Sequence, residues 1–295
     1  MKIKIFGYTG SVRPSPTEMI QKELVDLGCE VVEKEADCIL ETCGLYKNAQ
    51  KFWNEDGKKA VRIFNLLDVN NQNPNFYDQA WRDYEDCEIA CTISNTVKAE
   101  IREKFRTFRE IHVINFPIRP VSHLKYPRGI TSLYVGRFNC PNKRTWVINP
   151  TLQLLTLDPE NHLIVAGSER PPMGFFIENP GDVTLNELYN ASEFTWLPSV
   201  SEGIGLTCCE STICGSIPLL ANDSPVVREL GLKEFSVDPK PAAFVQLIKK
   251  IQKNPEYYWN IMDELRPVFL NKFSPQTIAK NILNLYNSYV GDRKS

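Results

Sequence analysis

Residues 197–223 read LPSVSEGIGLTCCESTICGSIPLLAND, and this stretch carries the clearest structural pattern in the chain. An apolar, strand-like run ends at Leu197, the loop Pro198–Gly205 follows, and residues 206–214 have a helical pattern. Glycine in the loop lets the backbone approach a ligand closely, and the first N–H groups of a helix have no partner within it. A strand, a glycine-containing loop and a helix N-terminus in this order are suited to binding a phosphate or diphosphate.

Two carboxylates accompany this loop. Glu202 lies within it, and Glu210 lies in the predicted helix that follows. A carboxylate does not bind an anion, so these two are expected to accept hydrogen bonds from hydroxyl groups, as on a ribose or a sugar ring. A surface loop with two solvated glutamates fits the same residues, and the pattern alone does not decide between the two interpretations.

Short apolar runs alternate with helical patterns along the whole chain, which predicts an α/β fold with parallel, doubly wound sheets. Residues 116–129 are rich in proline and break the alternation, which predicts a linker. The predicted domains are residues 1–128 and 129–295, with the last helix packing back on the first domain. Two such units favour two Rossmann-like domains that face each other across a cleft, with ligand bound at the carboxyl ends of the strands.

Polar caps and prolines mark the predicted helix starts. Thr17 is expected to cap a helix that runs to Leu27, and Asn149 is expected to cap one whose main turn begins at Pro150. Three further helices near the end of the chain are predicted to begin at prolines, namely Pro241, Pro255 and Pro275.

The composition is that of a globular protein, with 42% apolar and 24% charged residues among 295 and a net charge of −2. This excludes a disordered or fibrous chain and argues against a dedicated nucleic-acid-binding domain. No apolar run approaches the roughly 20 residues that span a bilayer, and residues 1–6 lack the apolar core of a signal peptide. Nine cysteines without a CxxC pair predict reduced thiols in an intracellular, cytoplasmic protein, not a disulfide scaffold or a zinc site.

The sequence resembles the retaining glycosyltransferases of the GT-B fold, the family 4-like enzymes known as glycosyl transferases group 1. Their Glu–seven residues–Glu signature is matched by Glu202 and Glu210. Four other segments resemble the family in order and spacing: TSLYVGRFNCPNKR (131–144), HLIVAG (162–167), ELYNASEFTWLPS (187–199) and CGSIPLLAND (214–223). The resemblance covers roughly residues 131–230, and the N-terminal half matches only in the order of its elements.

The resemblance implies a role for each matching position. Arg137 and Lys143 would pair with the diphosphate of the donor, and Glu202 would contact the transferred sugar. Glu210 would hold the ribose hydroxyls, and Gly10 would approach the diphosphate from the other domain. The backbone N–H groups of four residues would hold the sugar and the distal phosphate: Gly203, Ile204, Gly205 and Leu206.

The chain departs from the family at two places. Ser224 and Pro225 stand where members often have two glycines, and none of the three histidines lies at a strand end where many members use one near the donor sugar. Polar residues at strand ends are the candidates on the acceptor side, although each fits a capping or turn role equally well. They are Glu41, Asn65 and Asp68.

The implied reaction is transfer of a sugar from a nucleotide-sugar to an acceptor hydroxyl, with retention at the anomeric carbon. No metal or other cofactor is expected, since the family implies none and the sequence has no Asp-x-Asp motif. In a front-face route the leaving diphosphate itself takes the acceptor proton. A dinucleotide-dependent oxidoreductase is disfavoured because no GxGxxG spacing occurs. A non-catalytic protein that binds a nucleotide-sugar is the alternative.

The sequence does not identify the acceptor. Residues 98–128 contain eight lysines and arginines against three glutamates, and we call this segment the basic stretch. Arg102, Arg106 and Arg109 are predicted to lie along one side of a helix over 96–109. A solvated helix face and linker explains the charges. A polyanionic acceptor also fits, either nucleic acid such as a hydroxylated DNA base or a glycan or lipid at an anionic membrane.

Overall fold

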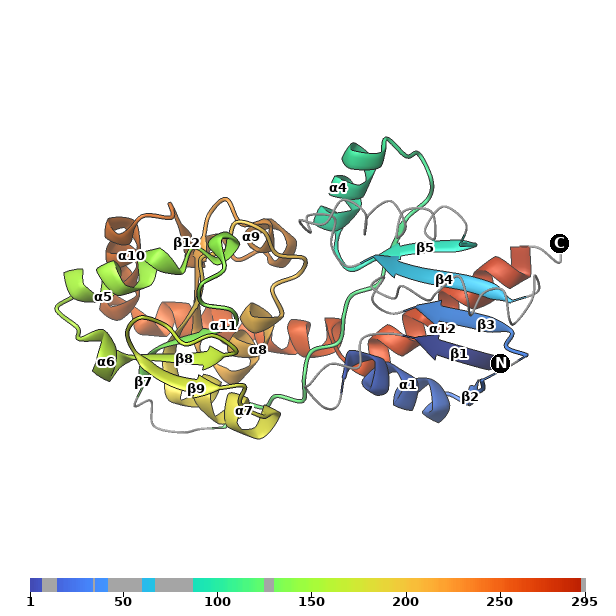
Figure 1. Ribbon diagram of the computed structural model, residues 1–295, viewed down its shortest axis with the longest axis horizontal. Coiled ribbons are helices and arrows are strands. Elements are labelled where there is room, and N and C mark those ends of the chain that lie inside the picture. The colour runs from blue at the N-terminus through green and yellow to red at the C-terminus, as the bar shows by residue number, and fades with distance from the viewer. Residues whose placement is uncertain (7–14, 34, 42–59, 67–86, 125–129, 293–295) are drawn as a thin grey trace. The chain divides into compact units, whose positions relative to one another are not determined.

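The computed structural model of the chain describes residues 1–6, 15–33, 35–41, 60–66, 87–124 and 130–292 (Figure 1). The chain forms two compact units. Unit 1 comprises Met1–Pro117 and Lys272–Ser295, and unit 2 comprises Ile118–Asn271. Each unit is built on its own parallel sheet, as the alternating pattern predicts.

Unit 1 contains a six-stranded parallel sheet in the order β2-β1-β3-β4-β5-β6. Its strands are β1 (Lys2–Phe6), β2 (Glu30–Val31), β3 (Cys38–Glu41), β4 (Val61–Leu66), β5 (Ile89–Thr92) and β6 (His112–Val113). Its described helices are α1 (Pro16–Asp26), α4 (Asn95–Phe105) and α12 (Pro275–Asp292). The direction of strand order changes between β1 and β3.

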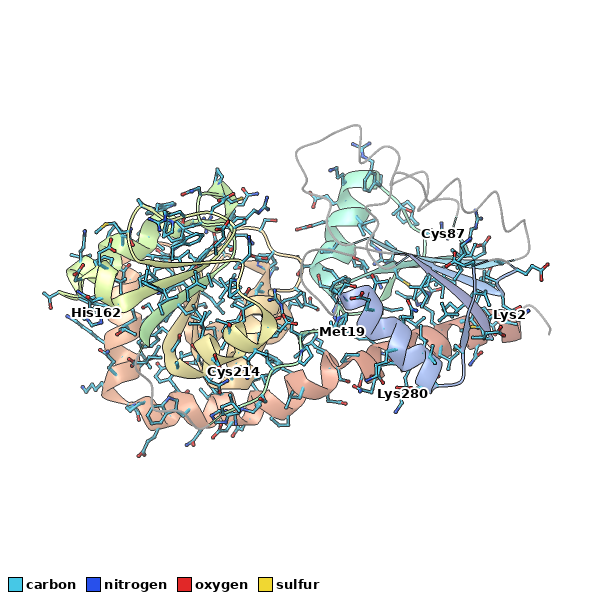
Figure 2. All side chains as sticks on the ribbon, turned by 60° about the horizontal axis from the view of Figure 1, so that its bottom comes forward. Lys2, Met19, Cys87, His162, Cys214 and Lys280 are labelled. Atoms are coloured by element: carbon cyan, nitrogen blue, oxygen red, sulfur yellow. The ribbon has the colours of Figure 1, made fainter. Side chains whose placement is uncertain are left out.

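The last helix of the chain belongs to the core of unit 1. Ile278, Ala279 and Ile282 of α12 are buried in the same apolar cluster as residues of α1 and the sheet. A side-chain hydrogen bond of 2.9 Å joins Gln276 Nε2 to Glu23 Oε1 on α1. In Figure 2, Met19 marks α1 and Lys280 marks α12 beside it.

Ser15, not Thr17, caps α1. The Ser15 hydroxyl accepts from the Glu18 amide at 3.2 Å, and Glu18 Oε2 accepts from the Ser15 amide at 2.6 Å. This reciprocal pair is a capping box, and Pro16 occupies the first helical position, where no N–H is needed. The prediction that Thr17 caps the helix was wrong because Ser15 and Glu18 together satisfy two amides, which Thr17 alone cannot.

Unit 2 contains a six-stranded parallel sheet in the order β12-β11-β10-β7-β8-β9. Its strands are β7 (Ile130–Val135), β8 (Leu163–Gly167), β9 (Phe175–Glu178), β10 (Ser192–Leu197), β11 (Ile217–Ala221) and β12 (Ser236–Val237). Its helices are α5 (Ile148–Leu154), α6 (Pro159–His162), α7 (Asp182–Ala191), α8 (Leu206–Cys214), α9 (Pro225–Leu230), α10 (Pro241–Lys253) and α11 (Pro255–Lys272). The strand order reverses between β7 and β10.

Asn149 lies inside α5, so it does not cap that helix. Two short 3-10 turns, Pro141–Lys143 and Thr145–Val147, lead directly into α5, and Val147 occupies the cap position without a side-chain bond. The Thr145 hydroxyl donates to the Phe138 carbonyl at 2.5 Å and fixes this approach. The prolines predicted to begin α10, α11 and α12 do begin them.

The chain passes from unit 1 to unit 2 at the start of the predicted linker. Ile118 is buried, and two asparagines of α7 hold the residues that follow. Asn186 Oδ1 accepts from the Ser122 amide at 2.9 Å, and Asn190 Oδ1 accepts from the Leu124 amide at 2.6 Å. Residues 118–124 are therefore part of unit 2, because side chains of α7 accept the hydrogen bonds of the Ser122 and Leu124 amides.

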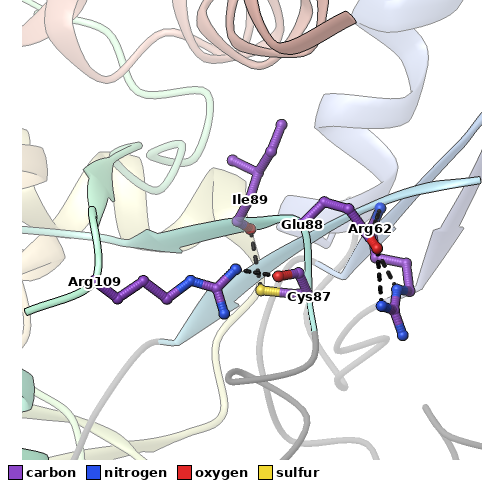
Figure 3. Close-up of polar contacts among 5 residues, drawn as sticks. All are labelled: Arg62, Cys87, Glu88, Ile89 and Arg109. Carbon is purple, nitrogen blue, oxygen red and sulfur yellow. Dashed lines mark hydrogen bonds and ion pairs between the residues drawn. The ribbon is translucent and has the colours of Figure 1, made fainter. Parts of the chain in front are cut away.

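The basic stretch does not form one helical face. The helix α4 ends at Phe105, because Arg106 takes a left-handed conformation with φ of 50°. Arg109 lies beyond the helix, and its guanidinium donates to the Cys87 carbonyl (Figure 3). The prediction that Arg102, Arg106 and Arg109 share one side of a helix was wrong for this reason.

Two further observations concern the predicted class of protein. The eight cysteines in the described ranges are free thiols, and seven of them are buried. Among the described residues, no helix is long and apolar enough to cross a membrane.

Candidate functional site

The sheet of unit 2 defines where a ligand is expected. Ligands of open α/β sheets bind outside the carboxyl ends of the strands, at the point where the strand order reverses. In unit 2 this point lies between β7 and β10, which pair in parallel. Two loops leave the sheet there: Gly136–Lys143 after β7, and Pro198–Gly205 after β10.

The two loops are joined to each other by two contacts. The Val200 amide donates to the Asn142 carbonyl at 2.9 Å. The Lys143 ammonium forms a direct ion pair with the Glu202 carboxylate, and the two side chains are 21% and 16% exposed. The structure therefore brings together a predicted phosphate-binding cation and the carboxylate predicted to contact the sugar.

Two glycines set the paths of these loops. A Cβ on Gly167, at the end of β8, would lie 2.1 Å from the Gly136 carbonyl oxygen, so β8 and the loop after β7 pack too closely for any side chain. Gly205 has φ of 70°, and a Cβ there would lie 2.7 Å from Val226. Both positions require glycine, one for close approach and the other for backbone conformation as well.

The amino end of α8 presents unpaired backbone donors. Gly205 occupies the cap position, and no side chain caps the helix. Among the described residues, no backbone carbonyl accepts a hydrogen bond from the amide of Gly203, Ile204 or Leu206. Such amides, together with the positive end of the helix dipole, favour an anion.

Arg137 extends from the same loop as Lys143. Its side chain is exposed, and the Tyr134 hydroxyl donates to its carbonyl oxygen at 3.0 Å. Burial, and then the nearby Glu202 charge, raise the pKa of Tyr134, so the phenol stays protonated and keeps this hydrogen bond. Tyr134 thus fixes the backbone from which Arg137 projects.

Glu210 lies deeper, in a buried cluster on α8 and α7. Its carboxylate is 2% exposed, Oε2 accepts from the Tyr189 hydroxyl at 2.9 Å, and Oε1 lies 3.4 Å from Nε of Arg119. Arg119 also lies 3.6 Å from Oδ1 of Asp182. Burial raises the pKa of Glu210, while Arg119 and the Tyr189 hydroxyl lower it.

Sequence reasoning did not find the roles of Arg119, Tyr189 and Asp182. It counted Arg119 only as a member of the basic stretch, whereas the structure pairs this side chain with two carboxylates of unit 2. No spacing signal connects Arg119 to Glu210, because the two lie in different elements far apart in the sequence.

A second ion pair supports the loop after β7. Two nitrogens of the Arg144 guanidinium donate to the two oxygens of Asp223, at 2.6 and 2.8 Å. Hydrogen bonding from Arg144 lowers the pKa of Asp223, which keeps the carboxylate charged. This bidentate contact ties the segment after Lys143 to the residues that follow β11.

The candidate residues of unit 1 are not part of this description. Gly10 and Asp68 lie outside the described residues. Glu41 ends β3 and Asn65 lies in β4, but their side chains also fall outside the description.

A family model described as "Glycosyl transferases group 1" matches residues 118–264, which include nearly all of unit 2. The two parallel sheets and the reversal between β7 and β10 match the GT-B fold of such enzymes. The chain belongs to the group 1 family of glycosyltransferases.

One curated relative is similar in sequence. It is the UDP-N-acetylglucosamine–peptide N-acetylglucosaminyltransferase GtfA subunit of Streptococcus parasanguinis, 25% identical over 199 residues. The match covers 59% of this chain and 39% of the relative, so the chain spans about two fifths of that protein's length.

Solved structures share the fold over nearly the whole chain. Sucrose-phosphate synthase from Thermosynechococcus elongatus has a TM-score of 0.78 at 12% identity and covers 99% of both chains. HepE from Anabaena, solved in complex with UDP and glucose, has a TM-score of 0.71 at 13% identity, with 98% and 100% coverage. A glycosyltransferase from Rickettsia africae has a TM-score of 0.72 at 14% identity, with 98% of each chain covered.

Proposed function

We propose that the chain transfers a sugar from a nucleotide-sugar to an acceptor hydroxyl, with retention at the anomeric carbon. The observation that carries this proposal is the Lys143–Glu202 pair, which joins two loops at the strand-order reversal beside the open amino end of α8. A cation, free amides and a carboxylate in one place suit a ligand that has a diphosphate next to a hydroxylated ring.

The donor would bind with its diphosphate on Lys143, Arg137 and the amides of residues 203–206. Negative charge grows on the distal phosphate oxygen as the glycosidic bond breaks, and donors that are already in place stabilise that charge most in the transition state. These groups supply the neutralisation for which other enzymes use a metal ion, so the proposal includes no metal or other cofactor. The departing diphosphate then takes the proton of the acceptor.

Glu202 would exchange partners when the donor binds. Lys143 turns to the phosphate, and the carboxylate becomes available to hydroxyls of the transferred sugar. The pair is 21% and 16% exposed, so a ligand reaches it without disrupting the core. Glu210, on the helix behind the loop, would accept from the ribose hydroxyls of the nucleotide.

The first donor to test is a UDP-sugar. The curated relative is named for UDP-N-acetylglucosamine and a peptide, and HepE was solved with UDP. A peptide is one acceptor to test. The other two are the classes that the basic stretch suggests, namely a hydroxylated DNA base and a glycan or lipid at an anionic membrane. We also propose a cytoplasmic location, because the free thiols are typical of reducing compartments.

The test is a donor screen followed by product analysis. Thermal shift with UDP-, GDP- and ADP-sugars identifies the nucleotide, and mass spectrometry with each acceptor class identifies the product. The anomeric configuration of the product, measured by NMR, tests retention. Donor binding without transfer or donor hydrolysis, for every acceptor class, would support a non-catalytic binding protein instead.

A further inference from the structure

Arg119 is half-buried in unit 2 and lies between two carboxylates. Its Nε is 3.4 Å from Oε1 of Glu210, and its Nη1 is 3.6 Å from Oδ1 of Asp182. Tyr189 is fully buried and donates to the other oxygen of Glu210 at 2.9 Å. One oxygen of Glu210 therefore accepts a hydrogen bond from Tyr189, and the other lies in an ion pair with the Arg119 guanidinium. The backbone amide of Arg119 also forms a hydrogen bond with the carboxylate.

This arrangement leaves a defined acceptor capacity. An ionised carboxylate has about four lone-pair sites, two on each oxygen. Tyr189 and the backbone amide of Arg119 occupy two of these sites, so about two remain for a ligand. Two neighbouring hydroxyls of a ribose supply two O–H donors, which matches the remaining capacity. A protonated Glu210 loses this match because one oxygen becomes a donor.

We propose that Arg119 and Tyr189 are positioning residues, which hold the Glu210 carboxylate charged and oriented to accept the two ribose hydroxyls of the nucleotide. Neither side chain needs to touch the transferred sugar. The inference rests on the proposed function, because it assigns a ribose to Glu210.

The surrounding charges determine how the protonation of Glu210 depends on pH. Burial raises the pKa of Glu210, Arg119 and then Tyr189 lower it, and Asp182 raises it again. Cys214, on the same helix, is a neutral thiol, because burial and then the Glu210 charge raise its pKa to about 12. Removing the guanidinium leaves burial and Asp182 opposed only by the hydrogen bonds from Tyr189 and from the backbone amide of residue 119, so the pKa of Glu210 rises further and the carboxylate protonates as the pH falls.

The first measurement needs no ligand. The thermal stability of Arg119→Met, Glu210→Gln and the double variant forms a cycle that isolates the coupling of the two side chains. We expect Arg119→Met to lower Tm clearly more in the wild type than in the Glu210→Gln background, because the neutral amide needs no counter-charge. Equal losses in the two backgrounds would overturn the proposal.

The second measurement is calorimetric binding of UDP and of 2′-deoxy-UDP between about pH 6 and about pH 8. We expect Arg119→Met to weaken UDP binding about tenfold or more at the lower pH and less at the higher pH. The ratio of UDP affinity to 2′-deoxy-UDP affinity also falls in Arg119→Met. Arg119→Lys restores part of the UDP affinity and part of this ratio. Tyr189→Phe lowers both, but by less than Arg119→Met.

Asn186→Ala is the matched control. Asn186 holds the Ser122 amide in the same segment but does not contact Glu210. Loss of UDP affinity in this variant equal to that in Arg119→Met would mean that anchoring the segment is all that matters, which overturns the proposal. Unchanged UDP affinity and ribose preference in Arg119→Met would overturn it too. If the wild type shows the coupling but binds no UDP, GDP or ADP, the proposed function itself fails, and the ribose role with it.

Discussion

Two half-buried ion pairs, one in each unit, differ in where they lie on their sheets. In unit 1, Glu88 precedes β5 and pairs with Arg62 near the start of β4, so the contact lies at the amino ends of the strands (Figure 3). In unit 2, Lys143 and Glu202 meet beyond the carboxyl ends of β7 and β10. Exposure does not distinguish them: it is 27% and 21% in the first pair, and 21% and 16% in the second.

The number of bonds within each pair does distinguish them. Glu88 accepts three hydrogen bonds from Arg62, one from its amide and two from its guanidinium, at 2.8 to 2.9 Å. Among the described residues, Glu202 pairs with one partner, the Lys143 ammonium. A carboxylate that accepts three hydrogen bonds from one neighbour stabilises the fold, whereas one paired with a single lysine can still accept hydrogen bonds from a ligand. Location at the carboxyl edge and unfilled acceptor capacity together support our proposal that Lys143 and Glu202 form the functional pair.

The largest expected effect is a loss of sugar transfer, which would distinguish Glu202 from Glu88. We expect Glu202→Ala to abolish sugar transfer while the protein stays folded, because a loop carboxylate with one partner contributes little to stability. Transfer assays and far-UV circular dichroism on the same preparation measure the two outcomes. Near-normal turnover in a folded Glu202→Ala protein would remove the functional assignment of this pair.

The next effect concerns the cations. We expect Lys143→Ala and Arg137→Ala each to weaken donor binding and to slow the chemical step, by about 2–4 kcal/mol in the transition state, because each removes positive charge beside a developing anion. Steady-state kinetics at varied donor concentration measures both constants.

A surface lysine of the same unit provides the control for this pair of variants. Lys240 pairs with Asp238 at 3.2 Å and is 73% exposed, so Lys240→Ala is expected to leave both kinetic constants within about twofold. If Lys143→Ala behaves like Lys240→Ala, the Lys143 side chain plays no part in binding the diphosphate.

A smaller effect, on stability alone, is expected in unit 1. Burial raises the pKa of Glu88, but the hydrogen bonds from Arg62 outweigh it and hold the pKa below its usual value. A lowered pKa contributes stability above the pKa of the unfolded chain, and that contribution is lost as the pH falls through the folded value. Glu88→Gln should therefore cost about 1–2 kcal/mol near neutral pH and less in acid, with sugar transfer unchanged. Urea unfolding at a series of pH values measures this. An equal cost at every pH would show that the charge of Glu88 is not involved.

The sequence predicted two parallel α/β units and the limits of α8, because apolar runs, glycines and prolines act locally. It did not predict the cap of α1, although Ser15 and Glu18 have the spacing of a capping box. The sequence placed the end of α4 at residue 109, whereas the helix ends at Phe105. An arginine gives no sequence signal for the left-handed conformation that Arg106 adopts.

The partners within the candidate site were less accessible to sequence reasoning. The family resemblance selected Lys143 and Glu202, but their direct contact depends on two loops that meet only in the folded sheet. The pairing of Arg119 with Glu210 depends on how residues 118–124 lie against α7, which no periodicity encodes. Long-range polar contacts of this kind follow from tertiary packing and are not visible as local patterns.

The smallest expected effect tests the basic stretch. Arg102 and Arg106 are exposed, whereas Arg109 is engaged with the Cys87 carbonyl and Arg119 with two carboxylates. The variant to make is therefore Arg102→Glu with Arg106→Glu, which reverses two exposed charges without breaking those contacts. We expect donor kinetics within about twofold of wild type, because neither arginine belongs to the proposed donor-binding loops and exposed charges contribute little. Binding of a polyanion weakens steeply with salt, since bound cations release condensed counterions. The acceptor Michaelis constant against salt, at saturating donor, decides between the acceptor classes.

A steep dependence of this constant on salt that the double variant flattens supports nucleic acid or an anionic membrane. A flat slope in both proteins leaves these arginines as a solvated face and favours a small or neutral acceptor.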